Sequence, residues 1–199
     1  MKLQRNTWIL IGFALILGGG VYFTERQNPT PTEVNAAQSQ KLFNFEESQV
    51  QTLVVKRAED TLKFKRTEDE TQPWQMTAPE SVPASEPAIA FLLNFLIEPQ
   101  IERRFSTEGD RLSEYGLDDP FATITVTVAD SKDKQTLLLG QPNYDEKFLY
   151  ALANPSKTDA EEVEVFLIPY AIRYAVEREY EEWKQASLED KEESEEVKP

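Results

Sequence analysis

The chain has 199 residues with 36 acidic and 21 basic side chains, which give a formal net charge of −15. It contains no cysteine and no histidine, so disulfides, thiolate metal sites, histidine-ligated zinc and the Ser-His-Asp triad are excluded. The acidic balance argues against nucleic-acid binding, because phosphate contacts need a cationic face. The length allows one ordinary domain with additional segments.

An uncharged apolar run lies near the start of the chain, at residues 7–23. As a helix it would span about 25 Å, at the short end for a bilayer crossing. Lys2 and Arg5 precede it, whereas Glu25 and Arg26 follow it and cancel. The positive-inside bias therefore predicts a cytoplasmic N-terminus and export of everything after the run. A cleaved signal peptide is the alternative, but no pair of small residues with cleavage-site spacing closely follows the run.

The segments after the apolar run differ sharply in composition. A stretch rich in proline and polar residues predicts a flexible tether, and the acidic, serine-containing C-terminus predicts a disordered tail. The predicted organisation has five parts: a cytoplasmic N-terminus (1–6), a transmembrane signal-anchor helix (7–23), a flexible linker (24–40), an exported α+β domain (41–184) and an acidic disordered tail (185–199).

Period-two patterns predict most of the exported domain to be β-sheet. The clearest is 123–128, where Ile124, Val126 and Val128 alternate with threonines. Polar or glycine- and proline-containing turns separate the predicted strands. These strands are 50–57, 61–67, 74–76, 123–128, 135–139, 148–153 and 163–168.

Helical patterns are fewer. Ser85 followed by Pro87 predicts a helix start, and the helix 88–98 is apolar nearly all round, which predicts a central core helix. Residues 111–115 predict one helical turn closed by Gly116 in the left-handed conformation. Pro169 opens a predicted last helix, whose inner stripe is Ile172, Val176, Tyr180 and Trp183. The fold class is therefore α+β, with one mostly antiparallel sheet, a central core helix and a C-terminal helix.

Several acidic groups are candidates for chemistry. Asp118 and Asp119 are adjacent carboxylates, which favours a turn or capping role over a hydrolase or cation site. Asp130 and Asp133 flank a predicted hairpin turn. This segment lacks the glycine and the distal glutamate of an EF-hand loop, which favours a solvated turn over a calcium site. The acids between Glu177 and Glu196 are typical of a solvated run. We expect no catalytic residue, no cofactor and no metal site.

One segment runs against the overall charge. Five cations outweigh Glu59 and Asp60 on the predicted hairpin formed by 50–57 and 61–67, namely Lys56, Arg57, Lys63, Lys65 and Arg66. Cations that alternate along a strand are often a solvated or aggregation-blocking face. The alternative interpretation is a docking patch for anionic lipid headgroups or an acidic protein partner.

The order of motifs resembles a known family. Its most specific piece is Tyr115-Gly116-Leu117-Asp118 with Pro120, followed by Leu139-Gly140. Over residues 1–184 the chain is similar to the cyanobacterial members of the bacterial domain-of-unknown-function 4340 family. The resemblance implies no established activity and no catalytic residues, and it implies a structural role for this motif. In a cyanobacterium the exported side would be the periplasm or the thylakoid lumen.

Three functions remain open at this point. The first is a non-enzymatic, membrane-tethered module that binds or scaffolds a membrane protein complex of the envelope or thylakoid. The second is an auxiliary subunit of a membrane transport system, which the resemblance suggests because some relatives accompany transport genes of the gliding-associated type. The third is a carboxylate-dependent hydrolase of envelope polymer, which needs two acids about 5–10 Å apart in a cleft.

Overall fold

The computed structural model describes residues 41–129, 134–155 and 162–186. Of the two units into which the chain divides, the described residues all belong to the second, Gln40–Pro199. Among them no helix is long and apolar enough to cross a membrane. The predicted anchor (7–23), the linker up to residue 40, the Asp130–Asp133 turn and the tail from residue 187 lie outside the described residues.

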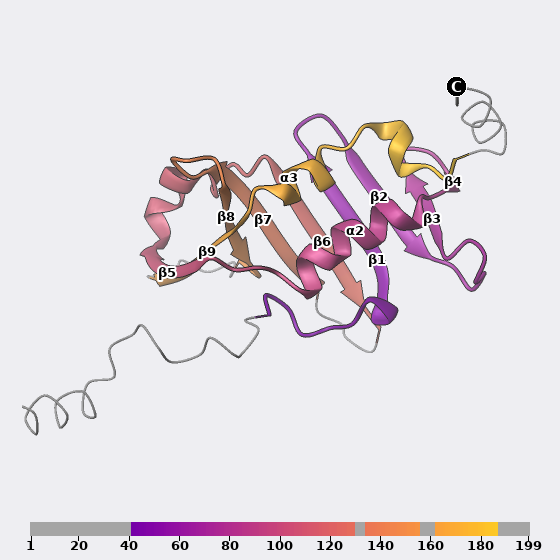
Figure 1. Cartoon of the computed structure of the whole chain (residues 1–199), viewed down its shortest axis with the longest axis horizontal. Helices are drawn as coiled ribbons and strands as arrows, with labels where there is room; N and C mark the ends of the chain where they lie inside the picture. Colours follow the sequence, from indigo (N-terminus) through magenta and orange to yellow (C-terminus); the bar gives the residue numbers. More distant parts are fainter. Residues whose placement is uncertain (1–40, 130–133, 156–161, 187–199) are drawn as a thin grey trace, which may run out of the picture. The chain divides into compact units, whose positions relative to one another are not determined.

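A nine-stranded antiparallel sheet forms the body of the second unit (Figure 1). Its spatial order is β4-β3-β2-β1-β6-β7-β8-β9-β5, so β4 and β5 are the edges. The mostly antiparallel sheet predicted from the sequence is confirmed. The strands are β1 Val50–Arg57, β2 Thr61–Arg66, β3 Trp74–Ala78, β4 Val82–Pro83, β5 Arg103–Glu108, β6 Ala122–Val128, β7 Lys134–Pro142, β8 Phe148–Ala153 and β9 Glu162–Pro169.

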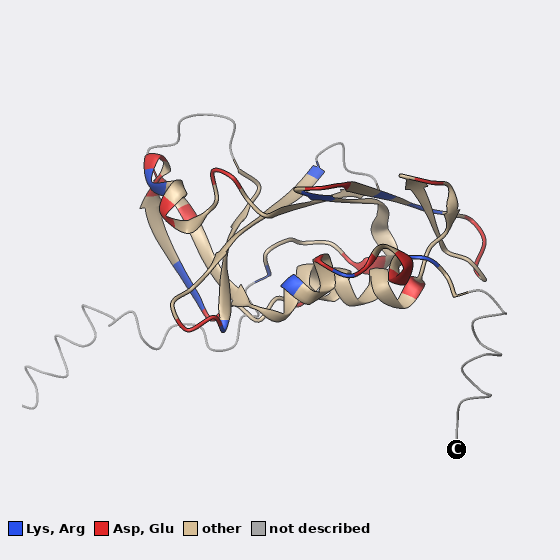
Figure 2. Ribbon diagram, turned by 90° about the horizontal axis from the view of Figure 1, so that it is seen from above, with Lys and Arg blue, Asp and Glu red and all other residues tan. Residues whose placement is uncertain are grey.

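The main core lies between one face of the sheet and a helical layer. In β6, Ile124, Val126 and Val128 are buried, and the threonines between them are half-buried. In β2 and in β1 from Leu53 onward the buried positions likewise recur every second residue, whereas an irregularity between Val50 and Thr52 interrupts this period at the start of β1. Because successive strand side chains point to opposite faces, one face of these strands is apolar and the other polar. Figure 2 shows the helices running along one side of the sheet.

Helix α2, Glu86–Ile97, supplies most of that layer. Its start is as predicted: the Ser85 hydroxyl accepts a hydrogen bond from the Ala88 amide at 3.4 Å, and Pro87 lies in the first turn. The all-round apolar sequence of the helix predicts burial on every side, but the structure buries only part of it. One side packs on the sheet through residues such as Leu93, which is fully buried, while Phe91 on the other side is 45% exposed.

The predicted single C-terminal helix is wrong. Helix α3 covers only Ala171–Val176, and a separate 3-10 turn, η3, covers Tyr180–Trp183. Ile172, Val176 and Trp183 are nevertheless buried, so much of the predicted inner stripe reaches the core in two pieces. The break has a tertiary cause, because the Arg57 guanidinium donates hydrogen bonds to backbone carbonyls where the helix stops, as described below.

The C-terminal segment also closes the β4 edge of the sheet. Ser85 donates its amide to the Trp183 carbonyl at 2.8 Å, and Gln185 donates its amide to the Pro83 carbonyl at 3.0 Å. Trp183 is fully buried, with its ring 5.2 Å from the ring of Phe64. The ordered chain thus continues past residue 184, where the predicted domain ends, and leaves the described structure at this edge.

A second, smaller core covers part of the opposite face of the sheet. The 3-10 helix η2, Gly109–Tyr115, follows β5 and packs over β8 and β9. Leu117, Leu152 and Val165 are buried there. The rings of Tyr115 and Tyr150 lie 4.9 Å apart, and aromatic packing of this kind fixes the η2 segment on the sheet. As a result, η2 covers the β7–β5 end of this face, whereas the strands toward β2 carry no such cover among the described residues.

Candidate functional site

The uncovered part of the sheet carries a regular array of lysine and threonine side chains. Residues that pair across neighbouring strands share a face, and three such rows cross β2, β1, β6 and β7. The first row is Lys65, Thr52, Thr127 and Lys134; the second is Lys63, Val54, Thr125 and Thr136; the third is Thr61, Lys56, Thr123 and Leu138. We call these twelve residues the lysine–threonine face. At one corner of it, Leu138 packs against the smaller core and marks where the covered part of the sheet begins.

The dimensions of the lysine–threonine face follow from sheet geometry. Neighbouring strands lie about 4.8 Å apart, and alternate residues along a strand lie about 7 Å apart. The array therefore measures roughly 14 Å in each direction between its outer backbone positions. Its four lysines are exposed and its threonines half-buried. Within it the Thr125 and Thr136 hydroxyls approach to 3.5 Å. The surface thus presents mainly ammonium and hydroxyl groups, with Val54 and Leu138 as its apolar positions.

The lysine–threonine face lacks negative charge. None of β1, β2, β6 and β7 contains an aspartate or glutamate, in a chain with 36 acids. Figure 2 shows many of the acidic residues in turns, loops and helices, while Glu108, Glu162 and Glu164 lie on the distant strands β5 and β9. Among the residues that the structure describes, none of Lys56, Lys63, Lys65 and Lys134 forms an ion pair. These ammonium groups are therefore available for an external anion as far as the described structure extends.

The predicted five-residue cationic patch is divided between the two faces. Lys56, Lys63 and Lys65 lie together on the lysine–threonine face, as their register shows. Arg57 and Arg66 point to the helical side. Arg66 donates to the Val50 carbonyl at 2.8 Å, and its guanidinium lies 4.5 Å from the centre of the buried Trp74 ring. The period of two along each strand is the signal that separates these residues.

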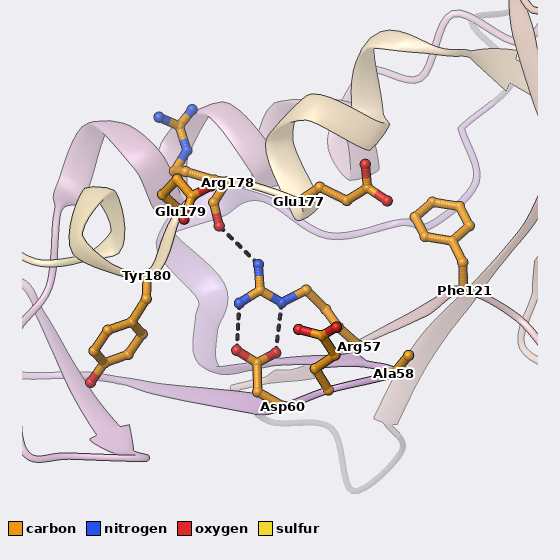
Figure 3. Close-up of a pocket in the computed structure, with 9 residues that line it drawn as sticks. Arg57, Ala58, Asp60, Phe121, Glu177, Arg178, Glu179 and Tyr180 are labelled. Atoms are coloured by element: carbon orange, nitrogen blue, oxygen red, sulfur yellow. Dashed lines mark hydrogen bonds and ion pairs between the residues drawn. The ribbon is translucent and has the colours of Figure 1, made fainter.

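Arg57 lines a depression of about 460 Å³ on the helical side, shown in Figure 3. Its guanidinium forms a bidentate pair with Asp60, with an Nε to Oδ1 distance of 2.6 Å. The remaining nitrogen, Nη1, donates to the Val176 carbonyl at 3.2 Å and the Arg178 carbonyl at 2.8 Å. These carbonyls lie at and just after the end of α3. The Arg57–Asp60 pair therefore ties the β1–β2 turn to the segment that follows this helix.

Several other charged and aromatic groups of this depression have internal partners as well. Glu177 pairs with Arg173 at 2.7 Å, and the Glu179 backbone amide donates to the Glu182 carboxylate at 3.1 Å at the start of η3. The Arg173 guanidinium also lies 4.7 Å from the centre of the Phe121 ring. Hydrogen bonding from Arg57 lowers the pKa of Asp60, whereas a catalytic general acid needs a raised pKa. The contacts in this depression therefore serve to hold the β1–β2 turn and the segment after α3 together.

The remaining acidic candidates lie apart from it. Asp118 and Asp119 are exposed, and the Asp118 carboxylate accepts a hydrogen bond from the Asp119 amide at 3.0 Å, which is a local turn contact. Together with Lys56 and Thr123 they line a separate depression at the rim of the lysine–threonine face. Within the described ranges no group of three or more acidic side chains is placed to hold a metal ion.

The two parts of the sequence motif, which begin at Tyr115 and at Leu139, pack against each other. Gly116 has a φ of 66°, the left-handed conformation predicted for it, and closes η2. Gln141, the residue after Gly140, donates its side-chain amide to the Glu114 carbonyl. Leu117 is buried in the smaller core, whereas Asp118 is exposed. In this structure the motif fastens the η2 segment to β7.

Comparison with known proteins gives one match. A family model described as "Domain of unknown function (DUF4340)" matches residues 74–198, which is more than half of the chain. No curated protein and no solved structure matches. The matched segment contains α2, most of the sheet and the motif around Gly116, but not β1 and β2, which carry Lys56, Lys63 and Lys65.

Proposed function

Because the chain belongs to the DUF4340 family, which brings no known activity with it, we propose a function from the geometry. The domain is a non-enzymatic binding module, tethered to a cyanobacterial envelope or thylakoid membrane by residues 7–23. It docks through the lysine–threonine face onto the acidic surface of a membrane protein complex. The exported location, in the periplasm or thylakoid lumen, is part of this proposal.

The observation that carries the proposal is the absence of acids from the lysine–threonine face. Four strands of a chain with net charge −15 bring four lysines and six threonine hydroxyls to one face that contains no carboxylate of its own, although Asp118 and Asp119 lie at its rim. Protection of a sheet edge by lysine does not account for them, because β2, β1, β6 and β7 are interior strands. Ammonium and hydroxyl groups are the donors that recognise anionic oxygens.

The charge distribution also orients the domain. Near an anionic surface each lysine contributes about 1 kcal/mol of attraction, while the acidic remainder of the domain is repelled. A tether of about 17 residues leaves the domain free to turn, so that modest energies are sufficient to select one orientation. Because these are exposed charges, the docking is expected to weaken as salt rises and the screening length falls below about 10 Å.

The experiment reverses two charges on β2, at one side of this surface. Lys63→Glu with Lys65→Glu is compared with the control Lys41→Glu with Lys147→Glu, which changes the net charge equally at exposed positions outside the face. Full-length chains are co-purified from native membranes at low and moderate salt. We expect at least a tenfold loss of co-purifying complex for the first pair alone, because two contributions of about 1 kcal/mol are reversed in sign.

Two results would overturn the proposal. Co-purification of both variants at the parent's level, at both salt concentrations, would show that the lysines are only a solvated strand face and do not dock a partner. Equal loss for both variants would show that total charge, and not this surface, controls association. A parallel assay on vesicles with anionic lipid identifies the class of the partner. Strong binding to these vesicles, without a co-purifying protein, would show that the partner is the lipid headgroups and not a protein complex.

A further inference from the structure

We infer that the chain's own acidic C-terminal segment, residues 187–199, binds the lysine–threonine face and competes there with the external partner. The regulatory part of this inference rests on the proposed function, but the intramolecular contact does not. The contact follows from the charge of the segment, the place where the described chain ends and the occupancy of the other cations near that place.

The charge of the segment complements the lysine–threonine face. Residues 187–199 contain six acids and two lysines, without an aromatic side chain to anchor them in an apolar site. The lysine–threonine face, in contrast, has four lysines and no acid. An acidic segment is repelled by the rest of a domain of this net charge, so this cationic surface is the favourable one for it.

The described chain ends close enough for the contact. Gln185 donates its amide to the Pro83 carbonyl on β4, at the edge of the sheet. The strand with Lys63 and Lys65 lies two places away from β4, about 10 Å, and β7 lies five places away, about 24 Å. Thirteen residues extend over as much as about 43 Å. The segment therefore reaches every lysine of the face without rearrangement of the domain.

The cations nearest to the exit point already have partners. Lys184 pairs with Glu80 at 2.6 Å and with Glu181 at 2.9 Å. Arg178 pairs with Glu182 at 3.6 Å. Arg66, the last residue of β2, donates to backbone carbonyls, and its guanidinium lies over the Trp74 ring. In contrast, the lysines of the face form no ion pair within the described residues, so they are the cations that the segment would gain by binding.

Covalent tethering makes even a weak contact effective. A short flexible connection gives the segment a local concentration in the millimolar range. If the segment covers the face nine-tenths of the time, the apparent affinity for an external partner falls about tenfold, because only the uncovered fraction binds. A partner with a larger acidic surface displaces the segment, and the exchange is sensitive to salt.

The contact is tested by zero-length crosslinking of the full-length chain with a carbodiimide, which joins lysine amines to carboxylates that touch. We expect peptides that join the acids of 187–199 to Lys63 or Lys65, and their loss at about 1 M salt, where the screening length is about 3 Å. A mixture of isotope-labelled and unlabelled chains separates crosslinks within a chain from those between chains. The matched control replaces the six acids of the segment by their amides.

Crosslinks confined to other lysines, such as Lys41 or Lys147, or crosslinks only between chains, would overturn the inference. Its consequence is measured by co-purification of a chain that ends at residue 186, for which we expect about a tenfold gain over the full-length chain. An unchanged yield would overturn the competition. Failure of the proposed function looks different: Lys63→Glu with Lys65→Glu would then leave co-purification unchanged in both lengths, whether or not the crosslinks form.

Discussion

Gly140 on β7 lies directly beneath the carbonyl oxygen of Tyr115. A Cβ atom built on Gly140 would stand 2.2 Å from that oxygen and 3.1 Å from the Leu117 side chain. On the other side of the contact, a Cβ on Gly116 would stand 2.9 Å from the Gln141 amide nitrogen. Two glycines 24 positions apart therefore allow η2 and β7 to approach at backbone distance, which explains why the sequence motif has two separated parts.

Gly140→Ala is expected to destabilise the domain by about 2 kcal/mol or more, because the added methyl group overlaps a backbone oxygen and the backbone would have to move to accommodate it. Gly116→Asn is the milder companion variant, since asparagine tolerates a positive φ better than other residues with a Cβ. Chemical unfolding measures both. A Gly140→Ala variant as stable as the parent would mean that the η2 segment does not approach β7 this closely.

Arg57→Met is expected to cost about 2–3 kcal/mol, because it removes a charged bidentate pair and two carbonyl partners from a largely buried side chain. Arg57→Lys should lie in between, since it keeps the charge but loses the planar geometry. Lys56→Met, one residue earlier on the exposed face, is the control and should change stability by less than about 0.5 kcal/mol. Equal losses at positions 56 and 57 would contradict the division of the two faces.

The pH dependence of stability tests the same pair. Because Arg57 holds the pKa of Asp60 below its ordinary value of 3.8, the pair contributes stability at pH values above that of the unfolded side chain. This contribution is lost as pH falls from about 4 through the lower folded-state pKa. Urea unfolding between about pH 6 and pH 2 should therefore give a shallower acid dependence for Arg57→Met than for the parent. Parallel curves would show that the pair is not formed.

Leu93→Ala is expected to cost about 2–5 kcal/mol, because Leu93 is fully buried between α2 and the sheet. Phe91→Ala, on the same helix, should cost about 1 kcal/mol, since 45% of the Phe91 side chain is already exposed. Thermal or urea unfolding of the two variants measures the difference. A smaller loss at Leu93 than at Phe91 would contradict the side on which α2 packs.

Local signals predicted most of the sheet. The alternation in β6, the polar turn between β1 and β2, and Gly116 in the left-handed conformation depend on neighbouring residues only, and the structure has all three. Strand β5, Arg103–Glu108, is not predicted, because five of its six residues are polar or charged and show no apolar period. It forms a strand only by pairing with β9. Its assignment needs the tertiary pairing.

The two errors of larger scale also have tertiary causes. The break after α3 depends on Arg57, which is 119 residues away from Val176 in the chain. The membership of the lysine–threonine face depends on the register of β1 with β6, since Lys56 pairs with Thr123. Alternation within β1 and β2 separates Arg57 and Arg66 from the three hairpin lysines, but only the register adds Lys134 and the threonines of β6.

The most direct test of the docking surface is photocrosslinking in native membranes. A photoreactive residue is placed at Thr125, in the middle of the lysine–threonine face, and in a second chain at Tyr174, which is 69% exposed on the helical side. We predict that Thr125 gives a defined adduct with one membrane polypeptide, that Lys63→Glu with Lys65→Glu abolishes it, and that Tyr174 gives none. Adducts from Tyr174 alone, unaffected by the lysine substitutions, would contradict the proposal.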